Sequence, residues 1–228
     1  MSTDEGKAHH NDRIEKWLRD LDVDTFGIAD MSRYGDEITG IGDLTARELP
    51  FALSFGIVLS AGVLETLKDG PTQLYLHHYR QLNYRLDMIG YFLGRSIERE
   101  GFRAVPFAAS QVVDWQRQRG HINHKKIGVM AGQGWIGRNN LLVHPLFGSR
   151  VRYNTVLTDM PLHCEKELDR DCADCEACVA ACPAGAIKTE RSDFDHHGCY
   201  EMLSRFRKER NIGHHICGVC VKVCGGRQ

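Results

Sequence analysis

The sequence lacks a long hydrophobic run and an excess of charge of one sign. Its longest apolar stretch, residues 49–63, contains serines and glycines and is too short to span a bilayer. With 29 Lys and Arg against 30 Asp and Glu, the formal net charge is −1. The overall charge therefore favours neither nucleic acid nor an anionic membrane. We expect no membrane partner and no DNA partner.

Export signals, repeats and low-complexity tracts are also missing. Residues 1–13 are polar and charged, without an apolar segment or a twin arginine, so we expect a chain that is not exported and whose N-terminus frays. The composition, 42% hydrophobic and 26% charged over 228 residues, is that of a soluble globular protein. This length predicts one large domain and one small one.

Cysteine, in contrast, is abundant. The sequence has nine, and eight of them lie at or after position 172 in two groups. The first group is Cys172-x2-Cys175-x2-Cys178-x3-Cys182-Pro183, and the second is Cys199 followed by Cys217-x2-Cys220-x3-Cys224. The first pattern is that of [4Fe–4S] ferredoxins, in which the fourth cysteine binds the other cluster. That rule predicts two ligand sets, one of Cys172, Cys175, Cys178 and Cys224, the other of Cys182, Cys199, Cys217 and Cys220.

Two other uses of these cysteines fit the spacing less well. A zinc site takes four ligands from two separated C-x2-C pairs, whereas here three closely spaced cysteines follow one another. Disulfides cannot comfortably bridge such near neighbours. Cys164 is left over and is expected to be an ordinary thiol. Because oxygen damages exposed clusters, we expect a reducing, cytoplasmic setting.

Hydrophobic periodicity predicts both helices and strands. We expect helices at residues 12–21, 74–101 and 126–131, and strands at 26–30, 50–60, 102–109, 140–144 and 150–158. The near-continuous apolar run at 50–60 indicates a central strand, and Pro106 indicates an edge strand. Residues 145–148 are expected to join the last two strands in a hairpin-like return. The buried stripe of the long helix is expected to consist of Leu74, His77, Leu82, Leu86, Ile89, Phe92, Leu93 and Ile97.

A glycine loop precedes the cysteines. Gly132-Gln-Gly134-Trp-Ile-Gly137 matches G-x-G-x-x-G, but a dinucleotide-binding loop needs a strand before it and a helix opening through it. Here the loop runs into a segment that looks extended. Two alternatives remain open: a turn that only shapes the core, or a loop whose missing Cβ atoms let the backbone approach a flat cofactor.

The motifs together resemble one family. Residues 130–149 (MAGQGWIGRNNLLVHPLFGS), residues 156–162 (VLTDMPL) and the cysteine run with PAGAI at 183–187 closely resemble epoxyqueuosine reductase, whose family shares its core with reductive dehalogenases. The match is most specific over residues 124–224. The resemblance implies a nitroreductase-like α+β cofactor domain at residues 1–161, followed by a small ferredoxin-like domain with two [4Fe–4S] clusters at residues 162–228.

The resemblance also implies a cofactor and a function. It implies an oxidoreductase of queuosine biosynthesis and tRNA processing, with electrons passing from a donor such as ferredoxin or flavodoxin through both clusters to cobalamin. The base-off corrinoid motif D-x-H-x-x-G is absent, in agreement with a cobalt that lacks a lower histidine. Flavin on the same scaffold is the alternative cofactor. The residues that the resemblance assigns to the corrinoid pocket are Gly132, Gly134, Trp135, Ile136, Gly137, Arg138 and Asn139.

Two departures from the family pattern bear on the function, beside a mild one, Gly225 in place of the usual proline after the last cysteine. Family members carry an aspartate, the proton donor, in a V-D-[ST]-A-P stretch after the long helix, whereas residues 105–110 read VPFAAS. Asp114 and Asp159 are the substitute candidates, although surface or capping roles explain both, so the catalytic residue is unknown. The helical-repeat extension that helps to hold tRNA is also absent from the sequence, which suggests a short form. These departures leave the substrate open and motivate an alternative function: a protein that delivers electrons to a partner's corrinoid or flavin without substrate chemistry of its own.

The basic stretch at residues 205–210 (RFRKER) has two interpretations. It is a surface that binds either tRNA phosphates or an acidic electron donor, or it is a solvated helix face. Paired histidines at 196–197 and 214–215 lie near the cysteines, but eight thiolates leave no cluster position for them.

Overall fold

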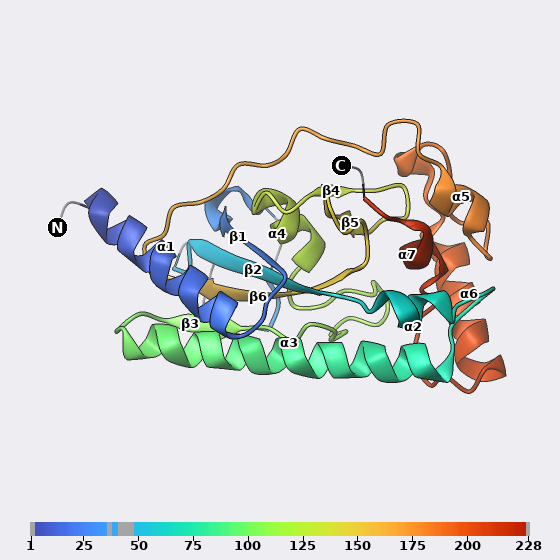
Figure 1. Ribbon diagram of the computed structural model, residues 1–228, viewed down its shortest axis with the longest axis horizontal. Coiled ribbons are helices and arrows are strands. Elements are labelled where there is room, and N and C mark those ends of the chain that lie inside the picture. The colour runs from blue at the N-terminus through green and yellow to red at the C-terminus, as the bar shows by residue number, and fades with distance from the viewer. Residues whose placement is uncertain (1–2, 36–37, 41–47, 227–228) are drawn as a thin grey trace. The chain divides into compact units, whose positions relative to one another are not determined.

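The structure is a computed structural model that describes residues 3–35, 38–40 and 48–226 (Figure 1). Its elements in chain order are α1 (Thr3–Asp20), β1 (Thr25–Asp30), the 3-10 turn η1 (Met31–Arg33), β2 (Phe51–Val58), α2 (Ala61–Glu65), α3 (Gln73–Arg99), β3 (Ala104–Pro106), α4 (His124–Met130), β4 (Trp135–Ile136), β5 (Leu142–Val143), β6 (Val151–Thr158), α5 (Ala177–Ala181), η2 (Arg191–Asp193), α6 (His196–Glu209) and α7 (Val219–Val223). This mixture of helices and antiparallel strand pairs confirms the α+β class. In the described part of the chain, no helix is both long and apolar enough to cross a membrane.

The chain forms two compact units, and each is discontinuous in sequence. Unit 1 consists of Met1–Ile57, Asn83–Gln133 and Arg152–Leu168, and unit 2 of Val58–Leu82, Gly134–Val151 and Asp169–Gln228. The sequence predicts a single division of the chain, after residue 161. The units differ from that linear division because two earlier segments, residues 58–82 and 134–151, pack with the cysteine-rich segment. The functional division into a cofactor domain and a cluster domain stays a prediction.

Unit 1 is built on a four-stranded sheet in the order β1-β2-β6-β3. The order confirms β2 as a central strand and β3, which contains Pro106, as an edge strand. Alternate residues of the strands belong to two apolar clusters, so both faces of the sheet are covered. One cluster joins the sheet to α1 and α3, and the other joins it to α4; Figure 1 shows α3 and α4 on opposite sides.

The N-terminal helix corrects one expectation. α1 begins at Thr3, so the prediction that residues 1–13 fray is wrong over the described residues. Acidic residues in its first turn interact favourably with the helix dipole. Asn11 Nδ2 donates to the His163 carbonyl oxygen at 3.0 Å, and Ile14 is completely buried. These contacts hold a segment whose sequence carries few apolar residues.

The buried stripe of α3 is narrower than predicted. Leu86, Ile89, Leu93 and Ile97 are at most 1% exposed, as expected. Leu74 and Phe92, however, are 51% and 41% exposed, and His77 is also exposed, so these three assignments are wrong. At the start of the helix, Tyr75 and Leu76 are buried instead. A shift of one position turns a side chain by about 100° around the helix, which is enough to change the face it lies on.

The predicted pairing after the glycine loop is also wrong. β5 pairs with β4 in a two-stranded sheet, Trp135 opposite Val143 and Ile136 opposite Leu142, and not with β6. The return at residues 145–148 exists, closed by mutual backbone hydrogen bonds of 2.9 Å between His144 and Gly148. Because a strand and no helix follows the glycines, the structure lacks the helix that a dinucleotide-binding loop requires at this point.

Unit 2 has a smaller apolar core. Its cluster joins α2 and the first turns of α3 to residues after α6: Leu59, Leu64, Leu67, Tyr75, Leu76, Ile212 and Ile216. Polar contacts repeat this connection, because Lys222 Nζ donates to the carbonyl oxygens of Glu65 and Leu67 at 3.3 and 2.5 Å. Residues 58–82 therefore support the segment that carries the last three cysteines.

Candidate iron–sulfur centre

All eight cysteines of the two groups lie in unit 2. Cys172 and Cys175 lie in the loop before α5, Cys178 lies on α5, and Cys182 caps its C-terminus. In the second group, Cys199 lies on α6, Cys217 precedes α7, Cys220 lies on α7, and Cys224 caps it. The helices α5 and α7 pack against each other, so the two cysteine groups are neighbours in space. All eight thiols are free of disulfides.

Electrostatic contacts identify which thiols lie together around Cys178. Burial raises the pKa of the Cys178 thiol to about 11, and the neighbouring thiols of Cys224, Cys172 and Cys175 raise this pKa further. These four are the set that the crossover rule predicts for the first cluster. We call them the first set.

The remaining four thiols form a second neighbourhood. Burial raises the pKa of Cys217 to about 11, and Cys199 and Cys182 contribute to this shift. The pKa of Cys220 is raised by burial and then by the same three thiols and Cys178. We call Cys182, Cys199, Cys217 and Cys220 the second set. Buried thiols that oppose one another's ionisation need a cation to become thiolates together, and bound metal deprotonates its thiol ligands.

The donor set fits iron–sulfur clusters better than zinc. Zinc needs its four ligands at about 2.0–2.3 Å from one ion. Among the residues that the structure describes, no three side chains of His, Cys, Asp or Glu are placed to hold one metal ion. A [4Fe–4S] cube instead takes four thiolates, one on each iron, so its ligands do not share one point.

Two N–H groups point at sulfurs of the first set. The indole Nε1–H of Trp135 donates to Cys172 Sγ at 3.5 Å, and the backbone N–H of Ser149 donates to Cys224 Sγ at 3.3 Å. Both donors come from residues 134–151 of unit 2. A Cβ at Gly148, where φ is +62°, would lie 2.0 Å from the Cys224 carbonyl oxygen. The glycine therefore permits the close approach that brings Ser149 to Cys224.

Arg138 holds the loop that carries the first cysteines. Its guanidinium donates to the carbonyl oxygens of Ala173, Cys175 and Thr189 at 2.8, 3.0 and 2.5 Å. The planar guanidinium can donate several hydrogen bonds at once in a fixed geometry. Arg138 thus connects the cysteine loop to the segment after α5.

The other residues assigned to the corrinoid pocket also contact protein. A Cβ at Gly134 would lie 2.0 Å from the Val143 carbonyl oxygen, and a Cβ at Gly137 would lie 2.6 Å from Val143 Cγ2. Buried Asn139 donates from Nδ2 to Ser149 Oγ at 2.8 Å, and half-buried Ile136 lies in β4. In unit 1, a Cβ at Gly132 would lie 2.7 Å from the Lys166 carbonyl oxygen. These contacts favour the alternative of a turn that shapes the core, and corrinoid binding by the seven residues stays a prediction.

The three remaining candidates lie outside the cysteine sets. Asp114 Oδ1 accepts from the backbone N–H groups of Gln116 and Arg117 at 3.0 and 2.9 Å, so it caps a turn. Asp159 accepts from the backbone N–H and Nε of Arg103, both at 2.7 Å. Cys164 is exposed and is not part of a disulfide. These contacts favour structural roles for the two aspartates.

Sequence reasoning missed the backbone donors and one carboxylate. The Ser149 donor and the Val219 N–H, which offsets part of the rise in the Cys217 pKa, are backbone groups that no residue type marks. Asp87 on α3 accepts from the Ala109 N–H at 2.8 Å and fixes the stretch where the family aspartate is absent. The sequence does not indicate this contact, because Asp87 and Ala109 are 22 residues apart.

The chain has relatives of known name over most of its length. No family model matches it. It is 26% identical over 237 residues to an epoxyqueuosine reductase of Aliivibrio fischeri, a match that covers 95% of this chain and 59% of the relative. The chain therefore spans less than two thirds of the length of that curated relative.

Solved structures show the same fold. A catabolic reductive dehalogenase, NpRdhA, matches with a TM-score of 0.71 and 20% identity, over 91% of this chain and 30% of the dehalogenase. An epoxyqueuosine reductase in complex with an epoxyqueuosine-modified tRNA-Tyr stem loop matches with a TM-score of 0.61 and 20% identity, over 95% of this chain and 65% of the reductase. The sequence resemblance is confirmed: the chain is a relative of the epoxyqueuosine reductases and shares its fold with them and with reductive dehalogenases.

Proposed function

We propose that the chain binds two [4Fe–4S] clusters and acts as an oxidoreductase resembling epoxyqueuosine reductase. The observation that carries the proposal is the packing of α5 against α7, which brings the two groups of four cysteines together within unit 2. Clusters of this kind supply one-electron transfer when bound. The chain's own residues hold the ligands: Arg138 fixes the loop of the first set, and residues 58–82 support the last three cysteines.

Cobalamin is the proposed electron acceptor within the protein, because a reductive dehalogenase with this fold is described as B12-dependent. One reductive dehalogenase with this fold, at a TM-score of 0.69 and 19% identity, is described with a mechanism for B12-dependent dehalogenation. The seven residues assigned to the corrinoid all contact other parts of the protein. Flavin remains the alternative. An anaerobic cobalamin titration separates the two, because a corrinoid and a flavin have different absorption spectra.

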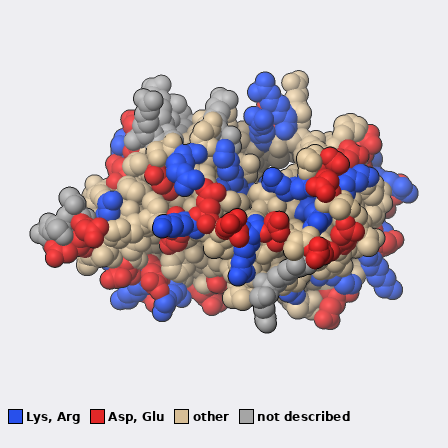
Figure 2. All heavy atoms as spheres, turned by 90° about the horizontal axis from the view of Figure 1, so that it is seen from above, with Lys and Arg blue, Asp and Glu red and all other residues tan. Residues whose placement is uncertain are grey.

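The substrate is proposed only at the level of the family. A relative binds a modified tRNA stem loop, and tRNA processing in queuosine biosynthesis is the matching role here. In the basic stretch, Arg205 Nε contacts both carboxylate oxygens of Glu209 at 2.9 Å, and Arg210 pairs with Asp69 at 2.9 Å. The face in Figure 2 likewise intersperses basic and acidic side chains. These pairs favour the solvated helix face, and tRNA affinity that falls steeply with salt would argue for the phosphate-binding alternative.

A second function has an observation in its favour. Residues 105–110 contain no acid, and the substitute candidates Asp114 and Asp159 are engaged in structural contacts. A protein that passes electrons to a partner's corrinoid or flavin needs no proton donor of its own. Turnover of a substrate by the isolated chain with a chemical reductant would exclude this alternative.

The deciding experiment is anaerobic reconstitution with iron and sulfide. We expect about eight irons per chain, the content of two [4Fe–4S] clusters. Cobalamin is then added, and the absorption spectrum is followed through reduction. A chain with about one zinc and no iron would overturn the cluster proposal. Full iron content without corrinoid or flavin binding would overturn the proposal that the chain is an enzyme. The electron-transfer alternative would then remain.

A further inference from the structure

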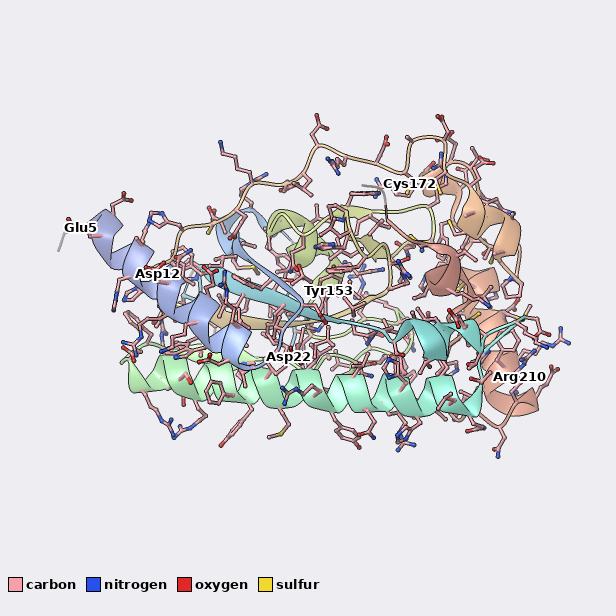
Figure 3. All side chains as sticks on the ribbon, in the orientation of Figure 1. Glu5, Asp12, Asp22, Tyr153, Cys172 and Arg210 are labelled. Atoms are coloured by element: carbon pink, nitrogen blue, oxygen red, sulfur yellow. The ribbon has the colours of Figure 1, made fainter. Side chains whose placement is uncertain are left out.

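Trp135 combines a buried ring with a hydrogen bond to a cysteine sulfur. The side chain is 5% exposed, and its Nε1–H donates to Cys172 Sγ at 3.5 Å. Cys172 (Figure 3) is the first ligand of the first set. Apolar packing alone would not require an indole, since a phenyl ring buries similar apolar surface without a polar atom.

The backbone fixes where the indole N–H points. Trp135 pairs with Val143 across the small sheet, and Gly134 before it has φ of +155°. A Cβ at Gly134 would lie 2.0 Å from the Val143 carbonyl oxygen, so the strands approach more closely than other residues allow. The donor is therefore held by packing and does not depend on a flexible side chain.

A fixed N–H donor changes the energy of a nearby cluster. Hydrogen bonds to the sulfurs are among the factors that set the reduction potential of iron–sulfur clusters. Reduction adds negative charge to the cluster and its thiolates, and a donated N–H stabilises that charge. The donor therefore raises the reduction potential. Ser149 N–H acts in the same sense on Cys224, a second ligand of the same set.

We infer that Trp135 is a positioning residue that raises the reduction potential of the first cluster through its indole N–H. This inference rests on the proposed binding of clusters. The indole acts on the first set, because its hydrogen bond goes to Cys172. Trp135 thus gives the chain a side-chain means of setting the potentials of its two clusters apart.

The test is the substitution Trp135→Phe, which keeps an apolar ring and removes the N–H. The control is Trp17→Phe on α1 in unit 1, where the ring is half-buried and lies 5.4 Å from the Arg13 guanidinium carbon. Both variants and the wild type are reconstituted anaerobically, and the two clusters are titrated by EPR. A Cys217→Ser variant, which removes a ligand of the second set, assigns the signals. We expect Trp135→Phe to keep its iron and to lower the potential of the first cluster only.

A second measurement keeps Trp135 in place, so it does not depend on the folding of Trp135→Phe. Pulsed EPR of the reduced protein with ¹⁵N-indole tryptophan should give a nitrogen coupling that persists in Trp17→Phe. Unchanged potentials in an iron-loaded Trp135→Phe, or no indole coupling in the wild type, would overturn the inference. A wild type that takes up no iron would instead overturn the proposed function.

Discussion

The two units differ in what stabilises them. Unit 1 has two apolar clusters, one on each face of a four-stranded sheet, and its long helix contributes four residues that are at most 1% exposed. Unit 2 has one smaller cluster, and the two short helices that carry cysteines, α5 and α7, have five residues each. Helices this short are not stable on their own in water. Apolar burial can account for unit 1, whereas the proposed clusters would join the cysteine segments of unit 2, whose apolar core is smaller.

The largest expected effect is the loss of structure on metal removal. Because metal binding is coupled to folding in such sites, a chelator acting on the reconstituted protein should abolish amide exchange protection in α5 and α7. Protection in β2 and β6 should persist, since no cysteine ligand lies in unit 1. Hydrogen exchange with mass spectrometry measures both. Equal loss of protection in the two units would refute the comparison.

A core substitution should give the reverse pattern. Leu93→Ala removes a completely buried side chain of α3 in unit 1 and should lower the free energy of unfolding by about 2–5 kcal/mol. Urea denaturation measures the change, and iron content should not fall. The control Met88→Ala, at a position 63% exposed on the same helix, should stay within about 0.5 kcal/mol of the wild type. Similar losses in both variants would contradict the assignment of the buried face.

Acid should weaken unit 1 through His124. Its Nε2 lies 3.1 Å from the Ala108 carbonyl oxygen and its Nδ1 lies 2.8 Å from Thr155 Oγ1, and burial lowers its pKa from 6.5 to about 4. Because the unfolded state binds the proton more readily, stability is full above pH 6.5 and falls as pH drops towards 4. The loss is at most about 3 kcal/mol.

The measurement is the pH dependence of amide protection in β2, compared with a His124→Gln variant. The glutamine keeps a donor for Ala108 and does not titrate, so its profile between pH 7 and 4 should be flatter. Identical slopes in the two proteins would show that His124 does not carry this dependence.

The smallest effect is expected from matched arginine substitutions. Arg138→Lys keeps the charge but loses the guanidinium that donates to three carbonyl oxygens in unit 2. A chelator should therefore remove the first cluster about fivefold faster, which corresponds to about 1 kcal/mol. Arg152→Lys is the control in unit 1, where the guanidinium contacts Asn83 and Ala109. It should lower the unfolding free energy without changing cluster loss. A faster loss in the control would contradict separate roles for the two units.

Patterns confined to neighbouring residues could be predicted well. The apolar run at residues 50–60 became a central strand, and Pro106 marked an edge. The predictions were wrong where contacts between distant residues determine the structure. α1 begins at Thr3 and is held by hydrogen bonds to residues 161 and 163, and β5 pairs with β4. Periodicity also misplaced Phe92, because one residue separates the buried and exposed faces of a helix.

For the candidate site, spacing identified the eight cysteines but not their surroundings. The glycine loop suggested a cofactor seat, whereas the described contacts attach it to the cysteine loop through Trp135 and Arg138. The signal for this role was weak, since an indole or guanidinium in a motif does not reveal its partner. The partners in each hydrogen bond, Trp135 with Cys172 and Arg138 with Cys175, lie 37 positions apart in the sequence.

The sequence by itself determined the two cysteine groups and the central buried strand, because each depends on the spacing or the chemistry of adjacent residues. Only the tertiary structure decided that residues 58–82 and 134–151 pack with the cysteines, that Trp135 and Ser149 donate to two sulfurs, and that the predicted proton donors are engaged elsewhere. The physical reason is that packing and hydrogen bonds between distant segments depend on how the whole chain closes, which no local pattern specifies.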